Sequence, residues 1–183
     1  MSDLIEFDDG EAVGLRVTGA RHAGAAFEKV RLVDAELVRC DLSGCDFREA
    51  KWHRVKVIDS RCTGIDLSQT SLRSVEFVDC KLDDANLRMA RLRDVRFKGS
   101  VLAAAELIAA ELDTVAFPEC DLRNANLSHV RCVNVDLRDA RLDGIQGIES
   151  LAGSTIGVDQ LVGLAPGLAR AVGLTIAVEE DEP

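Results

Sequence analysis

Hydrophobic residues recur at every fifth position over most of the chain. The series runs from Phe27 to Leu142 without a charged residue, and its register extends back to Ile5 and Phe7. A small or β-branched residue stands two positions before each of them, and the other three positions of each five-residue unit are mostly polar. A period of five fits neither the 3.6-residue period of a helix nor the alternation of a flat strand. It predicts short extended segments with two inward side chains and a corner, and therefore a β-solenoid.

The inward residues sort into columns at a spacing of 20. One column is mostly valine, and another contains three successive phenylalanines: Ala35, Val55, Val75, Val95, Val115 and Val135, and Phe77, Phe97 and Phe117. A spacing of 15 mixes these sets. Because stacked coils place similar side chains above one another, four units should form one coil. The register holds 28 units from Ile5 to Gly144 without an insertion, which predicts about seven coils spaced ~4.8 Å apart.

The units that begin at Cys40, Cys45, Ala85, Cys120 and Ala125 resemble the A(D/N)LXX consensus of pentapeptide-repeat proteins. This resemblance covers about three quarters of the chain. It implies an all-β solenoid, specifically a right-handed quadrilateral β-helix. We assign residues 1–146 to this β-helix, with an irregular first coil, and residues 147–183 to a C-terminal cap or dimerisation segment with an acidic tail.

A different pattern begins after Gly144. We expect a last partial coil through Ile156, a short helix capped by Asp159, and a second helix that begins at Pro166 and ends at Gly173. A short strand over residues 174–178 and a solvated acidic tail over residues 179–182 should follow. These helices either cap the last coil or form a homodimer, as C-terminal segments do in quinolone-resistance members of the family. The candidate dimer contacts are Leu161, Leu164, Leu168 and Val172.

The charge of the chain lies mainly at its ends. The net charge is −10, but residues 5–144 hold 25 acidic and 21 basic residues. An acidic balance argues against direct binding of nucleic acid. We find no apolar run long enough for a membrane span and no secretory signal, so we expect a cytoplasmic protein.

Catalytic and metal chemistry is not expected. The six cysteines all fall on inward positions, where they act as small hydrophobic residues, and no C-x₂-C pair occurs. His22 is inward, whereas His53 and His129 are outward on different faces, so no nucleophile–base pair can be assembled. We therefore predict a non-enzymatic protein without a cofactor.

The outward residues suggest a protein-binding surface. The face centred on Leu32 carries seven basic and four acidic residues, whereas the face centred on Leu37 carries seven acidic and five basic residues. The second face also presents an apolar stripe, although β-propensity alone would explain that stripe equally well. Its candidate partner-binding residues are Val38, Ile58, Val78, Glu36, Glu76, Asp59, Asp79, Glu119, Asp136 and Asp139.

Two functions follow from this surface. The resemblance implies a DNA-mimic regulator that binds DNA gyrase and affects quinolone susceptibility. The acidic excess of the rod is only moderate, however, and a mimic needs a concentrated negative field. The alternative is a scaffold or interaction module with an unrelated cytosolic protein partner.

Overall fold

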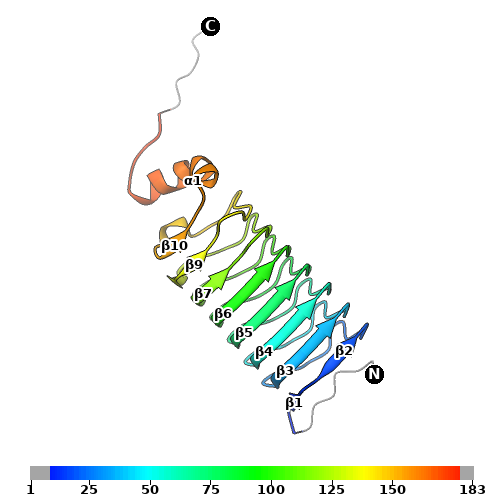
Figure 1. The fold of residues 1–183 in the computed structure, drawn as a ribbon. Helices are drawn as coiled ribbons and strands as arrows, with labels where there is room; N and C mark the ends of the chain where they lie inside the picture. Colours follow the sequence, from blue (N-terminus) through cyan, green and yellow to red (C-terminus); the bar gives the residue numbers. More distant parts are fainter. Residues whose placement is uncertain (1–8, 178–183) are drawn as a thin grey trace.

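The computed structural model describes residues 9–177, which form a rod of stacked coils with a helix at its C-terminal end (Figure 1). One ten-stranded parallel sheet runs along the rod. Its strands are β1 (Glu11–Val13), β2 (Arg16–Thr18), β3 (Arg31–Val38), β4 (Lys51–Ile58), β5 (Ser71–Val78), β6 (Arg91–Lys98), β7 (Glu111–Ala116), β8 (Arg131–Val133), β9 (Val135–Asp136) and β10 (Ser154–Thr155). The helices are the 3₁₀ helix η1 (Ile148–Ser150) and α1 (Val158–Ala171).

Strand pairing confirms that four units form one coil. Leu32 of β3 pairs with Trp52 of β4, and Trp52 pairs with Leu72 of β5, each 20 residues further along. Isolated parallel bridges join the remaining segments with the same offset, as between Asp46 and Asp66. We name the four faces by their residues in the coil of β3 and their equivalents every 20 residues: face A (31–34), face B (36–39), face C (41–44) and face D (46–49).

The core of the rod is a continuous apolar column that contains an aromatic ladder. The inward leucines, valines and cysteines are almost completely buried. The aromatic rings contact one another from coil to coil at centroid distances of 4.9–6.0 Å, in the order Phe27, Phe47, Trp52, Phe77, Phe97 and Phe117. Trp52 contacts Phe47 edge-on and Phe77 face-on, so it carries the ladder from one inward column to another.

Each corner of the coil is a residue in the left-handed conformation. Every fifth residue from Asp9 to Gly144 has a positive φ, and most of these residues are not glycine. On faces C and D, an Asp or Asn often precedes the inward residue, and its Oδ1 accepts the backbone N–H two residues on. Asp46 accepts from Arg48 at 3.0 Å, and Asn126 accepts from Ser128 at 3.1 Å. This Asx turn is a physical reason for Asp or Asn at that consensus position.

The C-terminal segment corrects two parts of the prediction. The partial coil is confirmed, because β10 pairs with β9. However, α1 is one helix instead of two, and it begins after Gly157 instead of Asp159, which lies in its first turn. Pro166 lies inside the helix, where packing overrides its tendency to end helices. Gly167, next to it, lies so close to Ile148 that a side chain would collide with the isoleucine.

The ends of the described region agree with the prediction only in part. Gly173 has a φ of 80° and follows Val172, the C-cap residue of the helix, as expected for a helix stop. Residues 174–177 form no strand, which corrects that expectation. Strands β1 and β2 of the first coil have only three residues each, but they keep the register of the later coils, because Glu11 pairs with Arg31 and Arg16 pairs with Glu36. Ile5, Phe7, Val178 and the tail over residues 179–182 lie outside the described residues.

Candidate protein-binding surface

The apolar stripe of face B lies at the carboxyl ends of β3, β4 and β5. Val38 pairs with Ile58, and Ile58 pairs with Val78, so the three side chains stack in register. All three are only half-buried. β-Branched side chains stacked at the ends of strands shield one another, so part of the stripe is explained by the sheet itself. Lys98 occupies the next position along the column and ends the stripe.

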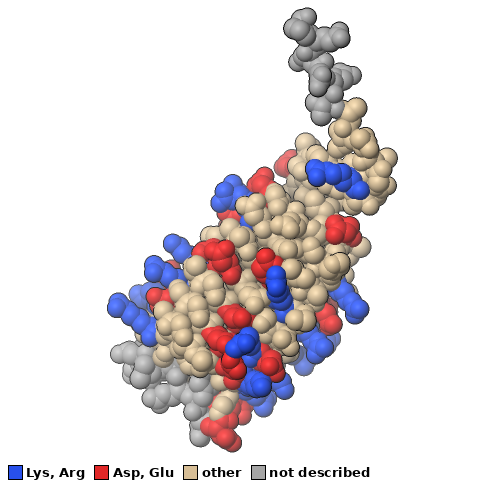
Figure 2. Space-filling model, turned by 180° about the vertical axis from the view of Figure 1, so that it is seen from behind, with Lys and Arg blue, Asp and Glu red and all other residues tan. Residues whose placement is uncertain are grey.

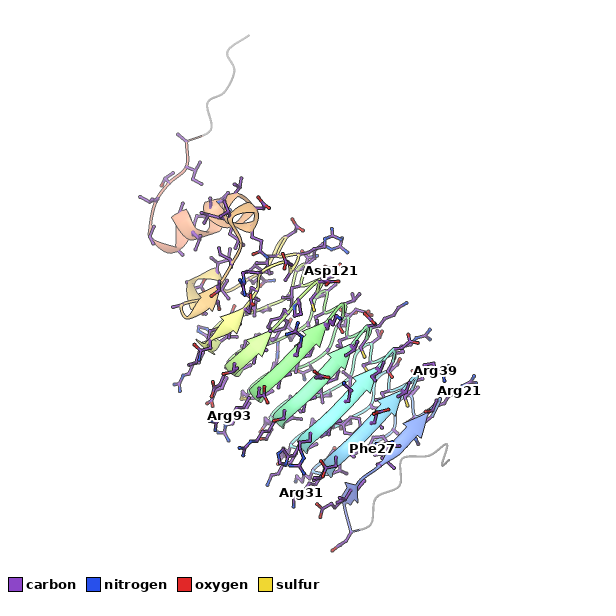
Figure 3. All side chains as sticks on the ribbon, in the orientation of Figure 1. Arg21, Phe27, Arg31, Arg39, Arg93 and Asp121 are labelled. Carbon is purple, nitrogen blue, oxygen red and sulfur yellow. The ribbon has the colours of Figure 1, made fainter. Side chains whose placement is uncertain are left out.

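Four carboxylates share the column at the corner between faces B and C. We name this column the acidic ridge; its members are Asp59, Asp79, Glu119 and Asp139, and Gly99 interrupts it. Asp59 and Asp79 lie beside the stripe, whereas Glu119 and Asp139 lie beyond its end. All four residues are exposed and have positive φ values of 47–62°. None forms an ion pair within 4.0 Å among residues 9–177. Arg39 occupies the same corner column one coil before Asp59 and projects from the end of β3 (Figure 3).

Two of the other predicted acidic residues of face B are paired with a cation. Glu76 forms an ion pair with Lys56 at 2.8 Å, and this hydrogen bond raises the pKa of the Lys56 ammonium. Asp136 is paired with Arg138 at 2.7 Å, and the hydrogen bond from that guanidinium lowers the pKa of the Asp136 carboxyl. Glu36 lies next to Lys56 in the strand register and forms no ion pair within 4.0 Å among residues 9–177. The unpaired negative charge of face B therefore lies on the acidic ridge and on Glu36.

The remainder of the rod surface shows mixed charge. Seen from behind, Lys and Arg side chains alternate with Asp and Glu side chains along the rod, without a continuous field of one sign (Figure 2). Many of these charges are paired between or within coils. Arg48 bridges Asp46 and Glu28, and Arg123 holds Asp121 at 2.7 Å. Exposed pairs of this kind contribute about 0–1 kcal/mol each, so they solubilise the rod more than they stabilise it.

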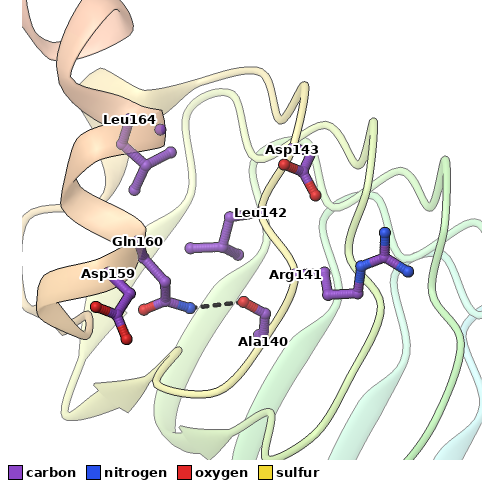
Figure 4. A pocket seen from close by; sticks show the side chains of 8 residues that line it. Ala140, Arg141, Leu142, Asp143, Asp159, Gln160 and Leu164 are labelled. Atoms are coloured by element: carbon purple, nitrogen blue, oxygen red, sulfur yellow. Dashed lines mark hydrogen bonds between the residues drawn. The ribbon is translucent and has the colours of Figure 1, made fainter.

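The C-terminal helix covers the open end of the last coil through Gln160. The Gln160 Nε2 donates to the carbonyl oxygens of Leu137 at 2.7 Å and Ala140 at 2.6 Å, and its Oε1 accepts the N–H of Gly157 at 2.6 Å. Figure 4 shows this contact at the rim of a hollow of about 240 Å³ between α1 and the coil. A side chain of α1 thus pairs carbonyl groups that the next coil would otherwise have paired.

The four predicted dimer residues have two different environments. Leu164 is 4% exposed and Leu168 is half-buried, and both pack against the core of the chain's own last coil. Leu161 and Val172 are 47% and 74% exposed. Val158 and Val162 add exposed apolar surface to the same helix. A groove of about 410 Å³, lined in part by Leu151, Ile156 and Leu168, lies beside it.

The cysteines and histidines lie where the register predicts. Five cysteines are buried and Cys132 is half-buried. Burial raises the pKa of the Cys80 and Cys120 thiols to about 11, so these thiols are poor nucleophiles at neutral pH. Within residues 9–177, no group of three His, Cys, Asp or Glu side chains could hold a metal ion. Over the same described range, no helix is long and apolar enough to cross a membrane.

Two serines have a role that the periodicity did not reveal. Ser60 and Ser100 alternate with Cys40, Cys80 and Cys120 in one inward column. The Ser60 hydroxyl accepts the N–H of Cys40 at 3.0 Å and donates to the Ile58 carbonyl at 2.8 Å, and Ser100 accepts the N–H of Cys80 at 3.1 Å. The alternation of serine and cysteine in the sequence could have indicated these hydrogen bonds. A requirement for small side chains in this column explains the alternation equally well.

Comparison with known proteins supports the same architecture. Residues 30–106 and 70–146 match the family model of the pentapeptide repeat region, and together they span the regular coils. No curated protein matches the chain. A trypsin-treated variant of QnrB1, a plasmid-mediated fluoroquinolone resistance protein, is 16% identical, with 91% of this chain and 97% of that chain covered and a TM-score of 0.36.

Two further solved structures are pentapeptide repeat proteins. HetL, involved in heterocyst differentiation regulation in the cyanobacterium Nostoc sp., is 16% identical over 78% of this chain and 87% of its own, with a TM-score of 0.32. A protein of the Arabidopsis thaliana thylakoid lumen is 24% identical over 57% of this chain and 73% of its own, with a TM-score of 0.40. The family match rests on the repeat, and function has to be argued from the surface.

Proposed function

The chain belongs to the pentapeptide-repeat family, and from this premise we propose that it is a non-enzymatic, cytoplasmic protein that binds a protein partner through face B. The inward positions of such a rod build the fold, so the outward positions carry what distinguishes one member from another. The observation that carries the proposal is the acidic ridge, four exposed and unpaired carboxylates of which two lie beside the apolar stripe.

A basic groove is the surface that complements the ridge. Carboxylates stacked in one column repel one another, and a partner's Lys or Arg side chains relieve that repulsion on binding. The stripe beside the ridge supplies apolar contact area next to the charges. A partner with cations flanking an apolar strip therefore matches face B better than a uniformly charged partner does.

DNA gyrase is the specific partner that we propose to test, because it binds duplex DNA in a basic groove. The charge density of the ridge decides how closely it resembles duplex DNA. Coils are spaced ~4.8 Å apart and Gly99 interrupts the ridge, so its four charges span five coils and occur about once per 6 Å, compared with one charge per ~1.7 Å in duplex DNA. The ridge has roughly a quarter of the charge density of DNA. The alternative function, a scaffold for another cytosolic protein, is favoured by this moderate density and by the apolar stripe.

A gyrase supercoiling assay with and without a quinolone tests the proposal. We expect the protein to alter supercoiling or to protect gyrase from the drug, and the variant Asp59→Asn/Asp79→Asn/Glu119→Gln to lose the effect. The matched control removes three carboxylates of face C, Asp83→Asn/Asp84→Asn/Asp143→Asn, and should retain it. A protein concentration of about 50 μM is high enough to detect micromolar affinity. If no effect is seen at this concentration, gyrase is ruled out and the scaffold function remains.

The apolar stripe and the helix are tested separately. Replacing Val38, Ile58 and Val78 with serine should leave the fold intact and weaken partner binding; unchanged binding would remove the stripe from the proposed surface.

We also propose that α1 forms a homodimer through Leu161 and Val172, because these residues are exposed whereas Leu164 is covered by the chain's own coil. Light scattering should give the mass of two chains, and Leu161→Ser/Val172→Ser should give the mass of one. A monomeric wild-type protein at micromolar concentration would refute the dimer.

A further inference from the structure

Face A carries a basic surface over β4, β5 and β6, far from the acidic ridge. In one column Lys51 pairs with Ser71, and Ser71 pairs with Arg91. In the column two residues along, His53 pairs with Arg73, and Arg73 pairs with Arg93. No acidic residue stands in either column between these coils. Arg73 and Arg93 are therefore neighbours across the sheet, whereas Ser71 separates Lys51 from Arg91.

The central cations of this surface are not neutralised. Lys51 and Arg73 are exposed and form no ion pair within 4.0 Å in the part of the chain that the structure describes. Arg91 and Arg93 face Glu111 and Asp113 of the next coil at 3.5 Å, longer than a hydrogen bond, and their side chains remain 75% and 69% exposed.

Arg54 of the same face, unlike Lys51 and Arg73, is held by an ion pair. Its guanidinium is bound by Asp34 through two nitrogens, at 2.5 and 2.7 Å. The pKa of Asp34 is lowered, chiefly by this hydrogen bond. Arg54 is thus engaged by its own coil stack, whereas Lys51 and Arg73 are available to a ligand.

The surface is also hollowed. An open depression of about 360 Å³ is lined by Arg31, Lys51, Trp52, His53, Ser71 and Arg73. Ser71 is exposed and adds a hydroxyl donor between the cations of the neighbouring coils. Figure 3 shows Arg31 and Arg93 along one edge of the sheet, whereas Arg39 lies at the other end of the strands. The depression and the acidic ridge are therefore on opposite edges of the same sheet.

We propose that face A over β3–β6 binds an acidic segment of a partner protein, rich in Asp and Glu and in an extended conformation. Across coils the cations of one column lie one or two coils apart, about 4.8 or 9.6 Å, and the two columns lie about 6.6 Å apart. Side chains on one side of an extended peptide repeat at about 6.6–6.8 Å. An extended peptide that lies along the strands can therefore place two successive carboxylates of one side against the two columns, and guanidinium groups bind carboxylates with directed hydrogen bonds.

Two observations favour a peptide over a nucleic acid. The basic surface is only one face wide, and the neighbouring face B presents the carboxylate of Glu36, which would repel the phosphates of a wider ligand. Single-stranded nucleic acids bind by stacking on exposed aromatic rings. Face A offers no Phe, Tyr or Trp ring, because Trp52, the one such residue in its described columns, is 1% exposed. This binding site is separate from the proposed surface on face B and does not depend on it.

The test uses the full chain and a fluorescein-labelled octaglutamate peptide, followed by fluorescence anisotropy. We expect saturable binding that weakens with added salt. The variant Lys51→Ser/Arg73→Ser should weaken it roughly tenfold, since two exposed charge contacts are lost. The matched control is Arg61→Ser/Lys81→Ser. It removes two cations that are joined by a backbone bridge between successive coils of face C. It changes the net charge equally and should leave the Kd within about twofold.

Several outcomes would overturn the proposal. These are no saturable binding of octaglutamate, equal weakening in both double variants, or tighter binding of a labelled thymidine octamer that Lys51→Ser/Arg73→Ser abolishes. The last result would assign the surface to nucleic acid. Circular dichroism of both variants checks the fold, and Lys51→Ser repeats the residue that Ser71 already supplies in the next coil. The salt dependence of the wild-type protein provides a measurement that needs no variant.

Discussion

Replacement of Phe97 by alanine is the sharpest test of how the rod is held together. The Phe97 side chain is completely buried. Its ring lies 5.0 Å from Phe77 and 5.1 Å from Phe117, with interplanar angles of 5° and 3°. The Phe97→Ala variant therefore leaves a cavity in the middle of the aromatic ladder and removes two ring contacts at once.

The expected cost follows from these contacts. Truncation of a buried phenylalanine to alanine costs about 3–5 kcal/mol. Each aromatic pair contributes about 0.5–1.5 kcal/mol beyond its buried area. Because the stacked backbone on either side restricts collapse of the cavity, we expect a loss of about 5 kcal/mol. The Phe97→Leu variant keeps most of the volume and loses only the ring contacts, so it should cost about 1–2 kcal/mol.

Urea unfolding measures both variants in the same way. Trp52 is the only tryptophan in the chain and is buried two coils away, so its fluorescence reports on a part of the rod that the substitution does not touch. Circular dichroism reports on all coils. If the rod unfolds as one unit, both signals will show the same loss in stability; separate transitions would mean that coupling between neighbouring coils fails at the cavity.

The reasoning would be refuted by a small or undifferentiated effect. A loss below about 2 kcal/mol for Phe97→Ala would show that the coils collapse into the cavity. Equal losses for alanine and leucine would show that ring stacking, and not the filled volume, stabilises the core. Should Phe97→Ala fail to fold, the leucine variant still tests the contribution of the ring contacts.

Three further predictions concern the corners, the cap and the surface charges. Thr114 is β-branched with a φ of 58°, so Thr114→Asn should raise the free energy of unfolding by about 1 kcal/mol, and an unchanged urea midpoint would contradict this strain. Gln160→Ala leaves the Ala140 carbonyl without the amide of Gln160, while the Leu137 carbonyl keeps only the bond from the Ala140 N–H, so it should cost about 2 kcal/mol, with faster amide exchange in α1 as the local sign. The pKa values of Asp121 and Asp136 are lowered, chiefly by hydrogen bonds from neighbouring arginines. Their stabilisation is therefore present above the unfolded pKa of about 4 and is lost as pH falls through the lower folded pKa, so the urea midpoint should be constant from about pH 7 to pH 5 and decrease below about pH 4.

The solenoid was predictable because its signal is repeated many times. Each inward position, such as Leu92 or Leu112, is weak evidence alone, but a mismatch at any coil would shift every later residue out of the core. The members of the candidate surface were also predictable, since outward positions follow from the same register. What the register could not give was their pairing. Glu76 and Asp136 occupy the same register position, yet Glu76 pairs with Lys56 of the preceding coil, whereas Asp136 pairs with Arg138 of its own coil.

The C-terminal cap could not be predicted in detail because it has no repeat to average over. Local rules for Asp159 and Pro166 favoured two helices, but contact between Gly167 and Ile148 holds one helix against the last coil. Nothing in the sequence around Gln160 indicates that its side chain binds the last coil. Its importance comes from carbonyl groups of Leu137 and Ala140, which lie 20 or more residues earlier in the chain.

The sequence by itself determined the period, the number of units in a coil and the inward or outward direction of each side chain, because these depend only on burying one apolar pair in every five residues. The tertiary structure decided how the four corners differ. Faces A and B form continuous strands such as β3 to β6, whereas faces C and D form tight turns, as where the N–H of Cys45 donates to the Leu42 carbonyl at 3.1 Å. Whether a face forms a strand or a turn depends on the backbone N–H and C=O groups that the neighbouring coils offer as hydrogen-bond partners. Those coils are 20 residues away in the sequence, so the local sequence does not reveal them.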